Sequence, residues 1–369
     1  MAQTNRRSMV VLFVTLVVIM LGFGMIIPLI PFYIDNFGAS GSELGLLMAT
    51  FATMQFFFAP VWGQLSDRHG RKGILMIGIL GNAISQLFFG LSTELWMLFA
   101  SRALAGILSA ATLPTAMAYI GDSTSDEDRG SGMGMIGAAM GVGMVLGPGL
   151  GGWLAGISLS MPFFVASALS ALMLVFVLVL LPESLPRDAR DQAGKGMHGP
   201  QLGEMWKALF GPIGFLLILA FLVSFGLANF EAVFGLYALE RYQYGPARVG
   251  TILTVIGLAS ALVQGGLTGP LTRRWGEVIV IRASLLGSAI GFVLMLQAQT
   301  YVAVLVTVSF FIISNALLRP AVSSLISRRT SGGQGVAMGL NNSFMSLGRM
   351  VGPASAGFAF DLNLNYPYW

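Results

Sequence analysis

The chain of 369 residues is 55% apolar and only 10% charged, and its mean hydropathy is +0.79. These values exclude an ordinary water-soluble domain and predict an all-α integral membrane protein. Because there is no cysteine and only two histidines, His69 and His198, we expect no disulfide, no metal site and no histidine-based catalytic centre.

Eleven apolar segments follow one another along the chain. Each approaches or exceeds the roughly 20 residues that a helix needs to span a bilayer. The segments are 8–34, 44–64, 73–93, 95–121, 131–155, 161–182, 209–235, 247–268, 277–298, 301–327 and 334–360.

The net charge of +4 is explained by membrane topology. With the N-terminus in the cytoplasm, most lysines and arginines fall in cytoplasmic segments, as the positive-inside rule requires. We therefore expect no nucleic-acid partner. Arg6 and Arg7 resemble the start of a signal peptide, but the apolar run after them is too long and lacks a small-residue cleavage site. We expect it to remain as the first membrane helix.

The motif GQLSDRHGRK joins the second and third segments. Small glycines let helix ends approach and turn tightly, and an acid near a helix end can pair with arginines or with a neighbouring helix N-terminus. Such contacts predict a cytoplasmic latch that forms when this side closes, although a basic loop that only fixes topology is the alternative. The latch residues are Gly63, Asp67, Arg68, Gly70, Arg71 and Lys72.

The fifth segment carries a glycine face, with Gly143, Gly147, Pro148, Gly151 and Gly152. Glycines at this spacing predict close helix packing, and the proline predicts a kink. This glycine face either serves only to pack two helices together or also lies at an interface that moves during function. No phosphate-binding G-x-x-x-x-G-K-[ST] motif occurs, so energy has to come from an ion gradient or a partner.

An internal repeat links the two halves of the chain. GPLTRRWGEV at 269–278 repeats the first motif 206 residues later, with Arg273 in place of the acid, and glycines of the fifth segment recur in the eleventh. We expect a six-helix bundle at 1–184, a cytoplasmic linker at 185–208 and a second bundle at 209–369. Two six-helix repeats predict twelve helices, so the last helix is expected to be missing from the 11 present; a native eleven-helix protein is the alternative.

Glu231 is the only carboxylate well inside a predicted membrane helix. A charge there costs about 2.5–3.5 kcal/mol on insertion scales, which a carboxylate avoids by taking up a proton. Arg319 and Arg102 cannot lose their charge and are candidate partners or fixed positive fields. A structural ion pair, or a position nearer the outer surface, is the alternative for Glu231.

Aromatic, methionine and polar side chains such as Phe230 could line a cavity for apolar or cationic molecules. Any single apolar residue is more easily explained by contact with lipid or another helix. Polar residues are better candidates, because lipid exposure would be costly for them. They are Gln55, Asn229, Asn341 and Asn342.

Several motifs together make the chain resemble the major facilitator superfamily. They are GQLSDRHGRK, SRALAGILSA, GMVLGPGLGG, SFGLANFEAVF, LLRPAV and GFAFDLNLNYP. The last three resemble the drug:proton antiporters, most closely the bacterial multidrug efflux pumps. The resemblance implies that Glu231 is the protonation site, Arg319 and Arg102 are cavity arginines, and Gln55 lines the cavity. Ala316 departs from the pattern, because those pumps carry an aspartate there.

The resemblance also implies the function. We expect a monomeric, multi-pass protein of the bacterial cytoplasmic membrane that is not an enzyme and needs no cofactor. It would use the proton gradient to export amphipathic or cationic drug-like molecules by alternating access. The alternatives are a proton-coupled exporter of one dedicated metabolite and a non-transporting membrane sensor.

Overall fold

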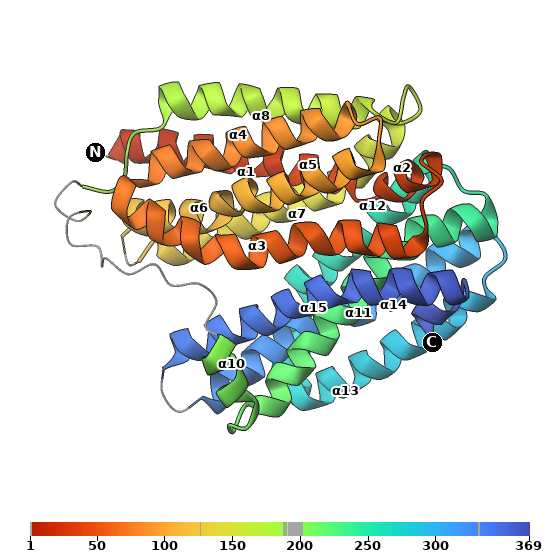
Figure 1. The fold of residues 1–369 in the computed structure, drawn as a ribbon. Helices are drawn as coiled ribbons and strands as arrows, with labels where there is room; N and C mark the ends of the chain where they lie inside the picture. The colour runs from red at the N-terminus through yellow and green to blue at the C-terminus, as the bar shows by residue number, and fades with distance from the viewer. Residues whose placement is uncertain (1, 126, 187–189, 191–201, 331–332) are drawn as a thin grey trace. The chain divides into compact units, whose positions relative to one another are not determined.

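The computed structural model describes residues 2–125, 127–186, 190, 202–330 and 333–369, and within these ranges the regular elements are all helices (Figure 1). The all-α prediction is confirmed, and each of the expected apolar segments lies on helical structure. Nine helical stretches in the described ranges are long and apolar enough to cross a membrane. One of them, Pro246–Gln297, turns sharply at Gly276, which has a φ of 76°.

The first part of the chain forms a series of helices joined by short connections. In order they are α1 (Ala2–Ile26), α2 (Ile30–Asn36), α3 (Gly41–His69), α4 (Arg71–Gly90), α5 (Leu95–Leu108), α6 (Thr112–Ser123), α7 (Arg129–Leu154) and α8 (Met161–Leu180). A 3₁₀ turn at Ser109–Ala111 separates α5 from α6. Pro114 explains this tightening, because its ring clashes with the carbonyl four residues before it.

The second part follows the same plan. Its helices are α10 (Leu202–Leu209), α11 (Gly214–Tyr242), α12 (Pro246–Leu262), α13 (Thr268–Gln297), α14 (Tyr301–Arg329), α15 (Gln334–Leu362) and a short 3₁₀ helix, η3 (Tyr366–Tyr368). A π-helical turn at Val263–Leu267 joins α12 to α13. The second copy of the motif, at 269–278, is therefore helical up to Gly276, where the chain turns.

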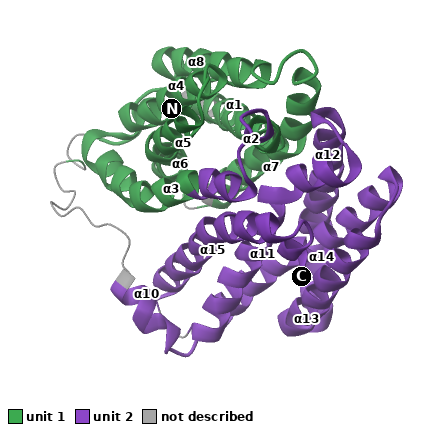
Figure 2. Cartoon of the chain, turned by 45° about the vertical axis from the view of Figure 1, so that its right-hand side comes forward, with its two compact units in different colours: residues 1–33, 50–200 green, residues 34–49, 201–369 purple. Residues whose placement is uncertain are grey.

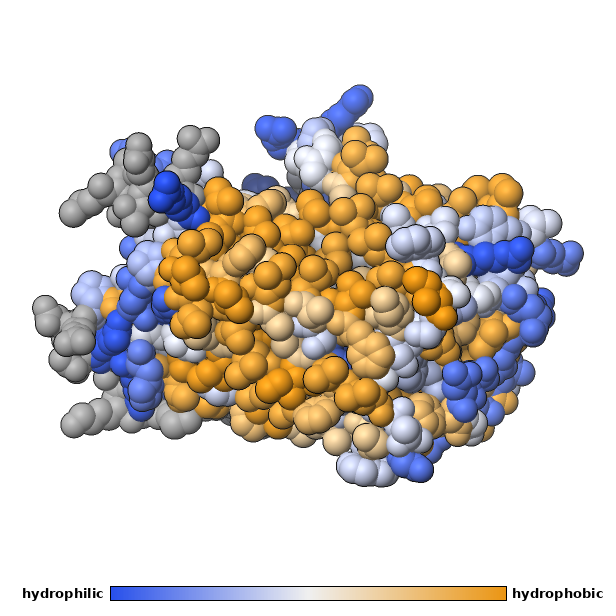
Figure 3. Space-filling view, turned by 90° about the horizontal axis from the view of Figure 1, so that it is seen from above, coloured by the Kyte–Doolittle hydropathy of each residue, from blue (hydrophilic) through white to orange (hydrophobic). Residues whose placement is uncertain are grey.

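The surface has the pattern of a membrane protein. In Figure 3, apolar residues cover the middle of one face and hydrophilic residues gather at its two ends. Trp96 at the start of α5 and Trp153 at the end of α7 are both largely exposed. Tryptophan at helix ends is typical of the boundary between lipid and water. These features support a multi-pass membrane protein.

The described helices gather into two compact units (Figure 2). Unit 1 contains residues 1–33 and 50–200, and unit 2 contains residues 34–49 and 201–369. The first residues of α3 therefore pack with unit 2, which sequence position alone did not indicate. The expected bundle boundaries remain a prediction, and most of the linker at 185–208 lies outside the described residues.

Unit 1 is held together by apolar contacts among α1, α4, α6, α7 and α8. Leu12 and Leu16 of α1 pack with Leu75 of α4, Tyr119 of α6 and Val177 of α8, and each of these side chains is almost fully buried. The Tyr119 hydroxyl donates to the Pro182 carbonyl at 2.9 Å, so this polar atom is satisfied at the edge of the core. In unit 2, the main packing pairs are α11 with α15 and α13 with α14.

Candidate functional site

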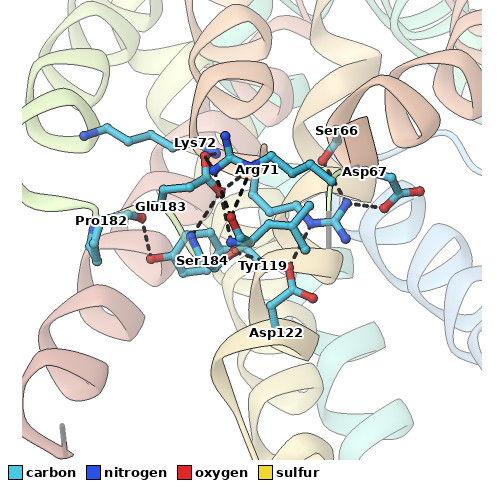
Figure 4. Close-up of polar contacts among 11 residues, drawn as sticks. Ser66, Asp67, Arg71, Lys72, Tyr119, Asp122, Pro182, Glu183 and Ser184 are labelled. Carbon is cyan, nitrogen blue, oxygen red and sulfur yellow. Dashed lines mark hydrogen bonds and ion pairs between the residues drawn. The ribbon is translucent and has the colours of Figure 1, made fainter. Parts of the chain in front are cut away.

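Arg71 is the centre of a polar cluster at the α3–α4 turn (Figure 4). Its side chain is buried, with the residue 7% exposed. The guanidinium donates to Asp122 at the end of α6 at 2.9 Å, to Ser66 at 3.1 Å, and to Asp67 one turn earlier. The motif therefore forms a charged contact between α3, α4 and α6 within unit 1.

Glu183, just after α8, completes this cluster. Its carboxylate accepts from the backbone N–H of Arg71 at 2.8 Å and of Lys72 at 3.2 Å, so it caps the N-terminus of α4. A carboxylate there satisfies free donors and matches the positive end of the helix dipole. Arg190 lies 3.5 Å away and partly balances the charge. Glu183, rather than Asp67, is thus the acid at this helix N-terminus.

The remaining residues of the predicted latch have different surroundings. Gly70 has a φ of 99°, a conformation that favours glycine, and it alone makes the turn between α3 and α4. Lys72 donates to the Leu178 carbonyl at 2.7 Å. Arg68 is half-buried. A Cβ at Gly63 would meet nothing within 4 Å, so the close helix approach expected there is not observed.

The second copy of the motif carries its own ion pair. Arg328 at the end of α14 donates to both oxygens of Glu277, at 2.8 and 3.1 Å, and Ser324 donates to one of them at 3.1 Å. Glu277 directly follows the turn at Gly276, just as Arg71 follows Gly70. The sequence comparison missed this pair because it considered only the position of Asp67.

The glycine face of α7 packs directly against α1. A Cβ at Gly143 would lie 2.5 Å from the Met20 Cβ, and a Cβ at Gly147 would lie 2.7 Å from the backbone of Gly24. Gly151 packs in the same way against Met25. Pro148 and Gly152 are also buried. These glycines therefore let two membrane helices touch through their backbones.

The same arrangement recurs in unit 2 between α15 and α11. A Cβ at Gly348 would lie 2.5 Å from the Phe221 carbonyl oxygen, and a Cβ at Gly352 would lie 2.7 Å from that of Phe225. The two halves therefore share a packing device as well as a sequence repeat. It fixes α15 beside α11, the helix that carries Glu231.

Glu231 on α11 interacts electrostatically with two arginines, Arg349 on α15 and Arg319 on α14. Glu231 is part-exposed, and both arginines are exposed. Charged side chains on long membrane helices avoid lipid and face protein or water. The charged triad of Glu231, Arg319 and Arg349 therefore marks a polar surface of unit 2. Sequence analysis found Glu231 and Arg319 but did not connect Arg349 to them.

The predicted asparagines and Phe230 differ in their solvent exposure within unit 2. Asn341 is 1% exposed and donates to Ser323 at 3.1 Å, while Asn342 is exposed. Asn229 is buried. The side-chain oxygens of Asn229 and Asn341 have no hydrogen-bond partner among the described residues. Phe230 is fully buried and stacks on Phe234 with ring centroids 4.8 Å apart, so it belongs to the apolar core of unit 2.

The two predicted cavity residues of unit 1 are Arg102 and Gln55. Arg102 on α5 is buried, with its guanidinium 5.4 Å from the ring centroid of Phe51 and 5.7 Å from that of Phe89. The aromatic rings offer partial compensation for this buried charge. Gln55 on α3 is part-exposed.

A metal centre finds no support in the described ranges, where no group of three or more acidic or histidine side chains could hold an ion. Long apolar helices, an internal repeat and charged residues inside the membrane instead define a multi-pass membrane transporter. The sequence profile of the Major Facilitator Superfamily matches residues 12–359. The chain belongs to this superfamily, which makes it a transporter and not an enzyme.

Curated relatives match nearly the whole chain. "Multidrug resistance protein 2" of Bacillus subtilis (strain 168) is 34% identical over 365 residues, covering 99% of this chain and 91% of the relative. "Quinolone resistance protein NorA" of Staphylococcus aureus (strain COL) is 30% identical over 364 residues, covering 98% and 92%. The resemblance to bacterial multidrug efflux pumps is therefore confirmed.

Solved structures share the fold at lower identity. A bacterial homologue of the human lysosomal transporter Spinster, in an inward-facing and unoccupied conformation, has a TM-score of 0.80 at 16% identity, over 97% of this chain and 83% of that one. The nucleoside transporter NupG has a TM-score of 0.78 at 16% identity, over 99% and 93%. These likenesses confirm the fold class.

Proposed function

We propose that this transporter exports amphipathic drug-like molecules in exchange for protons. The relatives with the names multidrug resistance protein and quinolone resistance protein support this substrate class. The protein would act in the bacterial cytoplasmic membrane, with its N-terminus in the cytoplasm, as a monomer and without a cofactor. The predicted bundles at 1–184 and 209–369 would be the two moving parts.

The observation that carries the proton coupling is the position of Glu231. It lies well inside α11, between residues that are almost all apolar, and among the described residues two fixed positive charges, Arg319 and Arg349, act on it. A carboxylate there can be neutralised by a proton or by a bound cationic group, but not easily by both. This competition couples export of substrate to entry of a proton.

In each unit, a set of polar residues would contact the substrate. In unit 2, these are Arg319, Asn229, Asn341 and Asn342, with Phe230 supporting them from the core. In unit 1, they are Arg102 and Gln55. Because most of these groups are polar and few are charged, they suit amphipathic molecules that offer hydrogen-bonding groups beside their apolar surface.

The ion-pair clusters at the helix turns would act as latches during alternating access. Arg71 links three helices of unit 1, and Glu277 links two helices of unit 2. Ion pairs at helix ends can form in one state and break in another. The backbone contacts of α7 with α1 and of α15 with α11 would keep these two helix pairs together while the ion pairs form and break.

The proton gradient supplies enough energy for this exchange. A proton that enters down 100 mV and one pH unit releases about 3.7 kcal/mol, the sum of about 2.3 and about 1.4 kcal/mol. One-to-one exchange with a neutral compound could therefore maintain a concentration ratio of several hundred-fold.

The test is proton release driven by substrate in inverted membrane vesicles with an imposed pH gradient. Addition of dyes and drugs should dissipate the gradient in vesicles with the native protein and not in vesicles with Glu231→Gln. Glu240→Gln, which changes the same residue type near the end of the same helix, is the matched control and should retain activity. If no member of a broad panel dissipates the gradient, drug export is wrong. A response to one compound alone would favour the dedicated metabolite exporter instead.

A further inference from the structure

The charged triad of unit 2 has more positive than negative charge. Arg319 and Arg349 act on the single carboxylate of Glu231, and they also repel each other. With Glu231 ionised, the triad carries a net charge of +1, and with Glu231 protonated it carries +2. Neither state is neutral, so part of the arginine charge lacks a counter-charge in the triad.

The packing of α11 against α15 holds Glu231 and Arg349 in place. Gly348 and Gly352 bring the two helix backbones into contact, and Arg349 directly follows Gly348. Arg349 also donates to Ser346 one turn earlier at 3.0 Å. Its guanidinium is therefore carried by a rigid helix pair rather than by a loop.

No direct ion pair neutralises either arginine within the part of the chain that the structure describes. Neither guanidinium lies within 4 Å of the Glu231 carboxylate, and Arg319 makes no hydrogen bond to a described residue. Ala316 lies one turn before Arg319 on α14 and is apolar, so no acid on that helix turn compensates it. Both arginines are also exposed, so their N–H donors are accessible.

Accessible, uncompensated guanidinium groups on membrane helices have a clear chemical preference. A guanidinium binds a carboxylate through two parallel charge-assisted hydrogen bonds, which are stronger than neutral ones. The preference increases away from bulk water, because the local dielectric constant is lower there. An ester of the same acid offers no charge and loses most of this interaction.

We infer that Arg349, acting with Arg319, makes this transporter prefer amphipathic substrates that carry a carboxylate over the same molecules with that group esterified. This inference rests on the proposed export function and specifies its substrate class. A substrate amine could still replace the proton at Glu231, so molecules with both an acid and an amine suit all three charges of the triad. Arg349 is a specificity-determining residue in this scheme.

Two rhodamine dyes form a matched pair for the test. Rhodamine 110 has a free carboxylate, and rhodamine 123 is its methyl ester. Binding of each dye to the purified full chain in detergent is measured by fluorescence anisotropy. We expect rhodamine 110 to bind about ten-fold tighter or more, as a charge-assisted hydrogen-bond pair implies. Arg349→Gln should remove most of this preference by weakening rhodamine 110 alone.

Two further variants exclude trivial explanations. Arg349→Lys keeps the charge but not the planar donor pair, so it should retain part of the preference even if Arg349→Gln folds poorly. Arg282→Gln removes a guanidinium from α13 that is not one of the two acting on Glu231, and it should leave the preference unchanged.

Two results would overturn the inference. Rhodamine 110 could bind no tighter than its ester, or folded Arg349→Gln protein could keep the native ratio of affinities. Failure of the proposed function gives a different result. In that case, the acid preference persists in the binding assay while no compound dissipates the pH gradient in vesicles.

Discussion

Arg71 and Glu277 stand 206 residues apart at the same position of the two repeats, yet they carry opposite charges. Each follows a glycine with positive φ, and each pairs with a residue at the end of a neighbouring helix. The partners Asp122 and Arg328 are also 206 residues apart. The repeat therefore keeps the ion pair and exchanges the two charges.

This relationship predicts that the second pair depends on opposite charge and not on which residue carries it. Glu277→Arg or Arg328→Glu alone places like charges together and should lower both thermal stability in detergent and transport. The combined exchange should recover most of the loss, because attraction is restored. If the combined variant loses as much stability and transport as the single variants, the two side chains do not stabilise each other.

The cap that Glu183 forms at the N-terminus of α4 should contribute measurably to stability. Glu183→Ala leaves the backbone N–H groups of Arg71 and Lys72 without their acceptor and should cost about 1 kcal/mol of stability. Glu183→Gln keeps an oxygen acceptor and should cost less. Glu204→Ala, which removes an exposed carboxylate paired with Lys207, is the control and should leave the melting temperature nearly unchanged. The same melting temperature in all of these variants would contradict the cap.

The glycine face of α7 predicts opposite effects for two glycine-to-alanine changes. Gly147→Ala forces its Cβ against the Gly24 backbone at 2.7 Å, so α1 and α7 must separate at a cost of about 1–3 kcal/mol. Gly141→Ala meets nothing within 4 Å and should stabilise the helix by about 0.5–1 kcal/mol. Melting temperatures of the two variants in the same detergent decide the matter. A lower value for Gly141→Ala than for Gly147→Ala would contradict the observed packing.

The fold could be predicted from sequence because its main signal is strong. Long apolar stretches have few alternatives to membrane helices, and Glu231 stands out because charged residues are rare within them. The residues at which the helices end and the turns begin were harder to predict. The polar residues at 269–276 form helix as readily as loop, and only the backbone shows that Gly276 makes the turn.

The site residues that the sequence analysis did not predict were missed for a common physical reason. Glu183 contacts Arg71 from 112 residues further on in the sequence, and Asp122 does so from 51 residues further on. Such contacts depend on tertiary packing, which one sequence does not reveal. Arg349 lies on α15, which is rich in glycine, serine and asparagine, so its charge did not stand out as that of Glu231 did.

The carboxylate of Asp361 holds the start of α3 within unit 2, and this contact can be tested. One carboxylate oxygen accepts from the Gly41 N–H at 2.7 Å and the other from the Ser42 N–H at 2.9 Å, so the end of α15 caps α3. Asp361→Ala should cost about 1 kcal/mol and speed hydrogen exchange at these two amides, whereas Asp361→Asn keeps an acceptor and should change both less. Asp35→Ala removes a nearby exposed acid that does not cap α3, so it should leave their exchange unaltered. Unchanged exchange at Gly41 and Ser42 in Asp361→Ala would show that the carboxylate does not hold this segment.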